Sequence, residues 1–274
     1  MIVDTKLKMK TIRKIFIAAI TLILSTIILG FGLVVNNKTK YAIGLVCIAY
    51  SALLLICWSN LIETPVALFS FFAFIVLLQL GSAVWSTYIS VSEKKREYSK
   101  IKAWIKAAVF GAVTIPLLAT VFLNKSEWLG YDVFYIPSQS MQPTLKPGDY
   151  ILVNTWYYSI DKPKLGEVIL FNHPQKSKMV MIKRITGVPG NKIFFDFIRY
   201  YLTSNKNNSK NIISVTLKEN QFFVTGDNYK QSIDSRFWGP LEKDNIIGKA
   251  IFIWFSLSSQ KNISFNYDRI GTRI

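Results

Sequence analysis

Residues 135–150 read Y-I-P-S-Q-S-M-Q-P-T-L-K-P-G-D-Y, and the rest of the chain is organised around this stretch. It places two serines, Ser138 and Ser140, between prolines that hold the backbone in extended and turn geometry. Because a stiff backbone fixes where a hydroxyl or an amide points, the stretch is a candidate nucleophile loop. A proline-rich surface turn explains these residues equally well, so the choice depends on blocks further along the chain.

The chain before this stretch is strongly apolar. The 274 residues are 51% hydrophobic and their mean hydropathy is +0.29, which is too apolar for an ordinary soluble domain. Residues 12–123 are nearly all hydrophobic blocks, whereas 131–274 mix apolar and polar residues. We therefore predict a membrane region over 1–123, a linker over 124–134 and a β-rich extracytoplasmic domain over 135–274 with its own core.

Several apolar runs are each long enough to cross a bilayer core, which takes about 20 helical residues. The first is too long for a secretory signal peptide and is followed by no small-residue cleavage site. We predict four transmembrane helices, with three as the alternative. They cover 12–35, 41–62, 65–89 and 103–123.

The formal net charge of +17 reflects basic residues that flank these runs, a placement that favours contact with anionic lipid headgroups. They are Lys6, Lys8, Lys10, Arg13, Lys14, Lys94, Lys95, Arg96, Lys100, Lys102 and Lys106. Because no nucleic-acid-binding motif is recognisable, we expect a lipid bilayer as partner and no nucleic acid.

The positive-inside rule gives conflicting indications of orientation. A cytoplasmic basic loop over 94–106 places the C-terminal domain outside. With four spans, however, the basic tail before residue 15 also lies outside, unless one run does not span.

Beyond residue 130 the pattern changes to short alternating runs bounded by Gly, Pro and Asn, which is typical of strands and turns. We predict a mainly antiparallel β domain with little helix and with a polar hairpin tip at Ser204–Asn211. The predicted strands are Tyr150–Trp156, Glu167–Phe171, Met179–Gly187, Lys192–Phe197, Gln221–Thr225 and Gly248–Trp254.

A serine hydroxyl needs a base, and two candidates stand out. His173, in F-N-H-P-Q, has no carboxylate neighbour in sequence and is typical of a surface turn. Lys183 lies in the apolar run M-V-M-I-K-R-I-T-G, where burial penalises the charged amine and makes it available as a base. A lysine whose stem lies at a sheet edge is the alternative, but the pairing with the Ser140 block favours a base.

A third block, G-D-N-Y-K-Q-S-I-D-S-R-F-W-G over residues 226–239, is rich in turn formers. Asp234 and Arg236 are compatible with a routine ion pair. Alternatively, Ser232 orients the lysine amine while the charged residues keep the loop rigid. The two cysteines, Cys47 and Cys57, share one apolar run and indicate neither a disulfide nor a metal site.

Four blocks occur in one order and resemble the successive signature boxes of the type I signal peptidase (leader peptidase) family. They are P-S-Q-S-M-Q-P-T-L, G-D-Y-I-L-V, I-K-R-I-T-G-V-P-G-N and G-D-N-Y-K-Q-S-I-D-S-R-F-W-G, and the match runs from about 136 to 254. The resemblance implies a multi-span helical membrane region followed by a signal-peptidase-like β fold. It also implies a membrane-bound serine endopeptidase that removes N-terminal signal peptides from exported preproteins without a cofactor or metal.

The resemblance also implies roles for individual residues. Ser140 is the nucleophile, Lys183 is the general base, and the Ser140 amide and Ser138 hydroxyl form the oxyanion hole. The supporting residues are Ser232, Asp227, Asp234 and Arg236. The substrate-binding residues are Ile136, Pro137, Met141, Leu145 and Ile182, which accept small residues at positions −1 and −3 of the signal peptide. The secretion machinery is a further candidate partner.

Two departures from the family pattern are visible. About 35 residues separate the lysine box from the third block, so a large inserted second domain found in some members is absent. The membrane region is also larger than the usual one or two spans. Alternatives are a conjugal-transfer-type maturation peptidase, a self-cleaving repressor relative and a non-catalytic membrane assembly factor.

Overall fold

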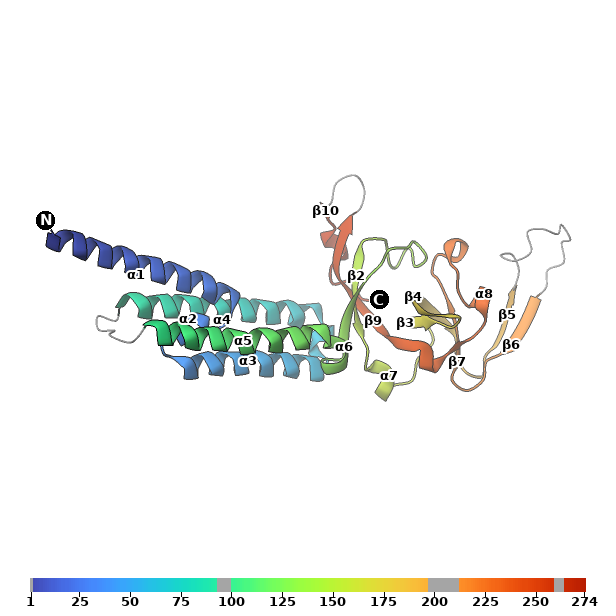
Figure 1. The fold of residues 1–274 in the computed structure, drawn as a ribbon. Helices are drawn as coiled ribbons and strands as arrows, with labels where there is room; N and C mark the ends of the chain where they lie inside the picture. Colours follow the sequence, from blue (N-terminus) through green and yellow to red (C-terminus); the bar gives the residue numbers. More distant parts are fainter. Residues whose placement is uncertain (1, 93–99, 197–211, 259–263) are drawn as a thin grey trace. The chain divides into compact units, whose positions relative to one another are not determined.

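The computed structural model describes residues 2–92, 100–196, 212–258 and 264–274 (Figure 1). The chain forms two compact units, Met1–Lys125 and Ser126–Ile274. The first is helical and the second is built on β-strands, as the sequence predicts.

The helices of the first unit include three that are long and apolar enough to cross a membrane. A short 3₁₀ turn, η1 (Leu61–Glu63), links α3 to α4. The helices are α1 (Ile2–Ile27), α2 (Phe31–Val35), α3 (Thr39–Trp58), α4 (Pro65–Ser92) and α5 (Lys100–Leu123), and the three long apolar ones are α3, α4 and the Ile101–Leu123 part of α5.

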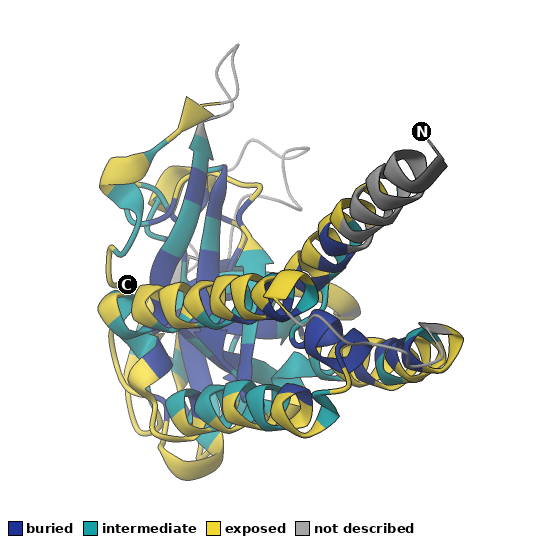
Figure 2. Cartoon of the chain, turned by 90° about the vertical axis from the view of Figure 1, so that its left-hand side faces the viewer, coloured by how far each residue is buried: buried dark blue, intermediate teal, exposed yellow. Residues whose placement is uncertain are grey.

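The apolar run predicted as one helix over 12–35 is two helices. α1 ends at Ile27, the chain turns at Gly30 with a left-handed φ of +78°, and α2 follows with all five of its residues buried (Figure 2). The Gly32 amide donates to Ser25 Oγ at 2.9 Å, and a Cβ at Gly32 would overlap that hydroxyl. Hydrophobicity alone misses this reversal because both segments are equally apolar.

The second unit is dominated by an eight-stranded, antiparallel sheet. Seven strands form the path β1-β2-β9-β3-β4-β7-β8, and β10 pairs with β9. The bounds are β1 (Tyr131–Tyr135), β2 (Asp149–Asn154), β3 (Val168–His173), β4 (Lys176–Gly187), β7 (Gln221–Thr225), β8 (Leu241–Glu242), β9 (Ile246–Ser258) and β10 (Ser264–Phe265).

Short helical turns connect these strands. They are α6 (Lys125–Trp128), α7 (Tyr157–Ile160), η2 (Tyr229–Gln231), α8 (Ser235–Trp238), η3 (Lys243–Asn245) and η4 (Tyr267–Arg269). The stretch 124–134, predicted as a linker, therefore contains α6 and most of β1. All five residues of β1 pair with β2, from Tyr131 opposite Asn154 to Tyr135 opposite Tyr150.

Strands β5 (Lys192–Asp196) and β6 (Ile212–Thr216) form a separate two-stranded sheet. Their apolar side chains, Ile193 and Val215, pack with Leu217 and Phe223 in a small cluster of their own. The polar stretch Ser204–Asn211, predicted as a hairpin tip, lies outside the described residues.

One strand has an edge that is only partly covered. β4 pairs with β3 from Arg184 opposite Val168 to Lys176 opposite His173. On its other side β4 pairs with β7, and that pairing begins only at Arg184 opposite Thr225. Among the described strands, none covers this second edge over residues 176–183.

Candidate active site

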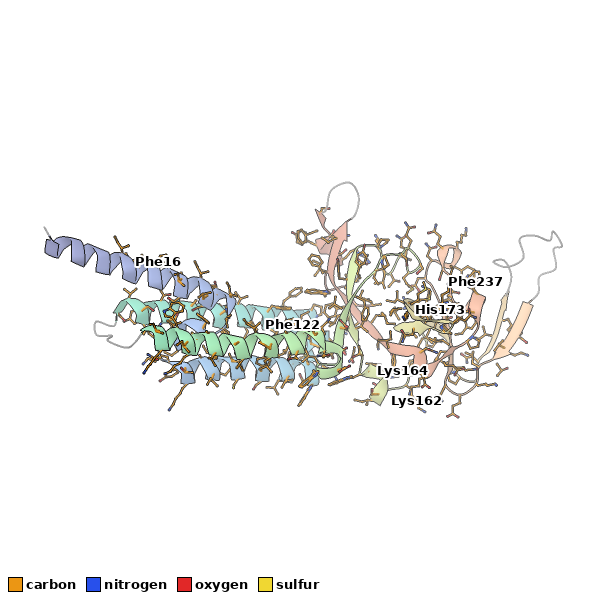
Figure 3. All side chains as sticks on the ribbon, in the orientation of Figure 1. Phe16, Phe122, Lys162, Lys164, His173 and Phe237 are labelled. Atoms are coloured by element: carbon orange, nitrogen blue, oxygen red, sulfur yellow. The ribbon has the colours of Figure 1, made fainter. Side chains whose placement is uncertain are left out.

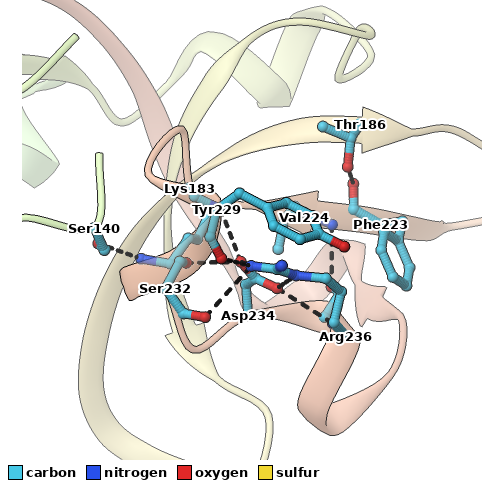
Figure 4. Close-up of polar contacts among 11 residues, drawn as sticks. Ser140, Lys183, Thr186, Phe223, Val224, Tyr229, Ser232, Asp234 and Arg236 are labelled. Carbon is cyan, nitrogen blue, oxygen red and sulfur yellow. Dashed lines mark hydrogen bonds and ion pairs between the residues drawn. The ribbon is translucent and has the colours of Figure 1, made fainter. Parts of the chain in front are cut away.

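Ser140 and Lys183 come together in the structure from separate elements. Ser140 lies in the connection between β1 and β2, and Lys183 lies on β4. Lys183 Nζ donates a hydrogen bond to Ser140 Oγ at 2.8 Å and another to the Ile182 carbonyl at 2.7 Å (Figure 4). Both residues are buried, with 7% of Ser140 and 3% of Lys183 exposed. A hydroxyl and an amine are thus within proton-transfer distance of each other and shielded from water.

Burial sets the protonation of Lys183. Loss of solvation penalises the ammonium form and lowers the pKa of Lys183 from 10.5 to about 8, while the carboxylates of Asp234 and Asp227 oppose this shift. Because the pKa lies near neutrality, a useful fraction of the amine is uncharged in mildly alkaline solution. An uncharged amine can accept the proton of a serine hydroxyl.

A second hydroxyl, that of Ser138, lies next to the Ser140 hydroxyl. Ser138 Oγ lies 3.2 Å from Ser140 Oγ, and the Ser140 amide donates to no acceptor among the described residues. The Ser140 carbonyl is fixed by the Asn228 amide at 3.0 Å. Gly226 allows this contact, because a Cβ at that position would overlap the Ser140 carbonyl oxygen and Ser232 Oγ. The oxyanion hole expected from the Ser140 amide and the Ser138 hydroxyl stays a prediction.

The third sequence block forms a buried network around Asp234, whose side chain is fully enclosed. Asp234 Oδ2 accepts from Ser232 Oγ at 2.6 Å and from the Gly226 amide at 2.9 Å, and Arg236 Nε donates to Oδ1 at 2.7 Å. Burial alone would raise the pKa of Asp234, but the hydrogen bonds from Arg236, Ser232 and the Gly226 amide lower it. Asp234 is therefore an anion that ties the loop together.

The Ser232 hydroxyl has a different hydrogen-bond partner from the one expected. Its hydroxyl donates to Asp234 and makes no hydrogen bond with the Lys183 amine, although Ser232, Lys183 and Asp234 are all among the described residues. The carboxylate is the stronger acceptor and captures the hydroxyl proton. Ser232 therefore supports the loop through Asp234.

Arg184 is a site residue that was missed in the sequence. Its Nε and Nη2 donate to the two oxygens of Asp227 at 2.8 and 2.7 Å, and its Nη1 donates to the Gly166 carbonyl at 2.7 Å. The same Nη2 reaches Thr144 Oγ1 at 3.3 Å. Asp227 is thus paired with the residue next to Lys183. The only sequence signal was the adjacency of Lys183 and Arg184.

His173 is not the surface residue that its turn-like sequence predicts. It is buried at the end of β3, where Nδ1 accepts from the Gln175 amide at 3.1 Å and the ring lies 5.7 Å from that of Trp238 (Figure 3). The described partners of His173 include neither Ser140 nor Asp234. A Ser-His-Asp arrangement is therefore not present in this geometry.

Three of the residues expected to line substrate pockets are core residues in the structure. Ile136 is 2% exposed, and Met141 and Leu145 are completely buried in one apolar cluster of the sheet. Ile182 is half-buried against the same cluster, and Pro137 is exposed. An apolar position looks the same in sequence whether it forms a pocket wall or the core beneath it, and the substrate-binding role of these residues stays a prediction. No group of three or more His, Cys, Asp or Glu residues gathers into a potential metal site within the described parts of the chain.

Comparison with known proteins identifies a family for this chain. Residues 101–206 and 199–255 match the family described as "Signal peptidase, peptidase S26". Signal peptidase I of Buchnera aphidicola is 26% identical over 65% of this chain and 86% of its own length. Signal peptidase I of Haemophilus influenzae is 27% identical over 66% of this chain and 79% of its own.

Other relatives are similar over a shorter part. A probable signal peptidase I of Synechocystis is 33% identical over 54% of this chain and 79% of its own. A crystal structure of a signal peptidase I from Enterococcus faecalis is 24% identical and covers 33% of this chain and 97% of its own, with a TM-score of 0.25. The family match covers more than half of the chain, and the chain therefore belongs to the signal peptidases of family S26.

Proposed function

We propose that this membrane-associated serine endopeptidase removes signal peptides with Ser140 as nucleophile and Lys183 as general base. The observation that carries the proposal is the 2.8 Å hydrogen bond between Lys183 Nζ and Ser140 Oγ in a buried setting. Family membership supplies the reaction, which is hydrolysis of the peptide bond after an N-terminal signal peptide.

In the first half of the reaction, neutral Lys183 accepts the proton of Ser140 as the hydroxyl oxygen attacks the scissile carbonyl. The Ser140 amide and the Ser138 hydroxyl stabilise the oxyanion of the tetrahedral intermediate. The Lys183 ammonium then protonates the departing amine of the mature protein, and the signal peptide remains bound as an ester. In the second half, Lys183 deprotonates a water molecule that attacks the ester, and the proton returns to Ser140.

The substrate is proposed to bind as an additional strand. The uncovered edge of β4 over residues 176–183 ends at Lys183, so an extended peptide paired with that edge would bring its backbone to Ser140. Pro137, before the nucleophile, is exposed and faces the same substrate path in this proposal. Small residues at −1 and −3 of the signal peptide, typically alanine, are part of this proposal.

The test uses the purified full-length protein and a preprotein whose signal ends in Ala-x-Ala. Ser140→Ala and Lys183→Ala should each abolish cleavage, while His173→Ala should keep most of it. All three proteins are compared at equal folded concentration by thermal unfolding. Cleavage at the wild-type rate by either of the first two variants would refute the assignment, and a large loss in His173→Ala would favour a histidine base.

The membrane arrangement follows from the reversal between α1 and α2. Ile15–Ile27, the apolar run of α1 that follows Lys14, has 13 residues, and at 1.5 Å each it spans about 20 Å of a bilayer core of about 30 Å. The start of α1, the end of α4 and the start of α5 lie at one end of the helical unit (Figure 1). We infer that α1 and α2 enter and leave the membrane on the same, cytoplasmic side.

Hydrogen bonds make such a reversal tolerable inside a membrane. Gln79 Nε2 donates to the Ser25 carbonyl at 2.6 Å, and Asn36 Nδ2 donates to the Ser86 carbonyl at 2.7 Å. Irregular backbone at membrane depth requires such partners within the protein. With three crossings, by α3, α4 and α5, the basic tail and the basic loop both lie in the cytoplasm and the catalytic domain lies outside.

This arrangement removes the conflict that four spans create for the positive-inside rule. A reporter enzyme active only outside the cytoplasm should work when fused after Ile274 and fail when fused before Met1. Activity at both ends would indicate four crossings, and activity at neither end would place the catalytic domain in the cytoplasm.

A further inference from the structure

The C-terminal segment is tied to the loop that carries Ser140 through one arginine. Arg269, in η4, donates from Nε to Asp149 Oδ1 at 2.9 Å and from Nη2 to Asp149 Oδ2 at 2.6 Å. The same Nη2 donates to the Thr144 carbonyl at 2.8 Å. Asp149 is completely buried, and Arg269 is 120 residues away from it in the chain. A planar guanidinium suits this task, since it can bind a carboxylate and a carbonyl at the same time.

Asp149 in turn closes the loop that contains the nucleophile. Its Oδ2 accepts from the Lys146 amide at 2.8 Å, and its carbonyl accepts from the Ile136 amide at 2.8 Å. The Gly148 amide donates to the Ile136 carbonyl at 3.0 Å. Residues 136 and 149 thus form the base of a loop whose middle contains Ser140, and Arg269 contacts that loop at Thr144 and Asp149.

The tail around Arg269 is itself docked firmly. The Gly271 amide donates to the Ile253 carbonyl at 2.7 Å, and the Ile274 amide donates to the Ile251 carbonyl at 3.0 Å. Ile274 also packs against the apolar cluster that includes Met141, the residue after the nucleophile. The segment that carries Arg269 is therefore hydrogen-bonded to β9.

We propose that Arg269 is a positioning residue for the nucleophile, which it keeps in place by fixing Asp149 and Thr144 of the Ser140 loop. The proposal rests on the proposed role of Ser140. The described contacts of Arg269 include neither Lys183 nor Ser140, so it acts through the loop. Its loss should lower the rate of the chemical step while the affinity for the preprotein and the pKa of Lys183 stay the same.

The experiment compares kcat, KM and the unfolding temperature for three changes in the full-length protein. Arg269→Met removes the guanidinium group. The double variant Asp149→Asn, Arg269→Met removes both charges, so that no carboxylate is left buried without a partner. Arg269→Lys keeps the charge but cannot reach Asp149 and Thr144 with a planar fork. The control is Lys249→Met, which breaks a comparable pair, Lys249 Nζ to Glu167 Oε1 at 2.8 Å, with no described contact to residues 136–149.

We expect each Arg269 variant to lose about tenfold or more in kcat per folded molecule, because small displacements of a reacting group are costly. KM should change by no more than about twofold, as expected when only transition-state interactions are lost. The acid limb of the pH–rate profile should keep its midpoint. Lys249→Met should lower the unfolding temperature with kcat unchanged.

Two results would overturn the proposal. One is a wild-type kcat per folded molecule in Arg269→Lys and in the double variant, while Ser140→Ala is inactive. The other is a loss of kcat no greater than in Lys249→Met, which would make the role of Arg269 purely structural. If Ser140→Ala still cleaves the preprotein, the proposed function fails, and the positioning role fails with it.

Discussion

Raising the pH from 6 to 9 should increase kcat/KM about 90-fold, because the proposed mechanism requires an uncharged Lys183. With a pKa of about 8, the amine is neutral in about 1% of molecules at pH 6, about 9% at pH 7 and half at pH 8. The rate should therefore rise about tenfold per unit at first and level off above about pH 9. A lysine with its ordinary pKa of 10.5 would give a rate that still rises at pH 9.

One substitution tests the physical origin of this pKa. The negative charge of Asp234 raises the pKa of Lys183, so Asp234→Asn should move the midpoint of the profile to lower pH. The assay is initial-rate cleavage of a preprotein at low concentration across pH 6–10, with unfolding measured at each pH to confirm that the variant is folded. His173→Ala is the matched control and should reproduce the wild-type curve.

The reasoning would be refuted by a rate that is flat from pH 6 to 9. A plateau already reached at pH 7 would also refute it, because that is the behaviour of a histidine base. A shift to higher pH in Asp234→Asn would show that the carboxylate does not act on Lys183 through its charge.

Three further predictions concern stability and packing. Lys183→Met should stabilise the protein by up to about 3 kcal/mol at pH 7. The pKa of Lys183 is about 8 in the folded state against 10.5 ordinarily, so burying the ammonium lowers the free energy of unfolding fully below pH 8 and no longer does so once the pH has risen through 10.5. Denaturant unfolding at about pH 7 and about pH 10.5 measures the gain, and an equal gain at both pH values would contradict the prediction. Gly226→Ala should lower the free energy of unfolding by about 1–3 kcal/mol and remove most of the activity, since the added Cβ would overlap the Ser140 carbonyl oxygen and Ser232 Oγ. Wild-type turnover in this variant would show that the loop can shift to accept the methyl group. Asp234→Ala should cost about 3–5 kcal/mol by leaving the Arg236 guanidinium buried without its partner, and a loss below about 1 kcal/mol in thermal unfolding would mean that the pair is solvated.

Ser140 and Lys183 could be predicted from the sequence because their residue types and the residues around them point to the same chemistry. Each block alone fits a surface turn or a sheet-edge lysine, but the two together predict a nucleophile and a base, and the structure brings the two side chains within 2.8 Å. The change from apolar runs to alternating runs likewise predicted a helical part followed by an antiparallel sheet. The general architecture follows from hydrophobic periodicity, which is a local property.

Features that depend on distant partners were not predictable in this way. Asp149 gives no sign in sequence that its partner is Arg269, because the pairing depends on how β9 and the tail fold back. Asp227 similarly pairs with Arg184 across the contact of β4 with the third block. The end of α1 was missed for another reason, since the turn at Gly30 ends the helix without ending the run of apolar residues.

The separate β5–β6 sheet has a practical consequence for this enzyme. Its two strands hydrogen-bond to each other and are not members of the eight-stranded sheet that carries Lys183. Polypeptide added between Asp196 and Ile212 would therefore lengthen the connection between β5 and β6. A fluorescent or affinity module inserted there would leave every strand of the sheet that carries Lys183 unchanged.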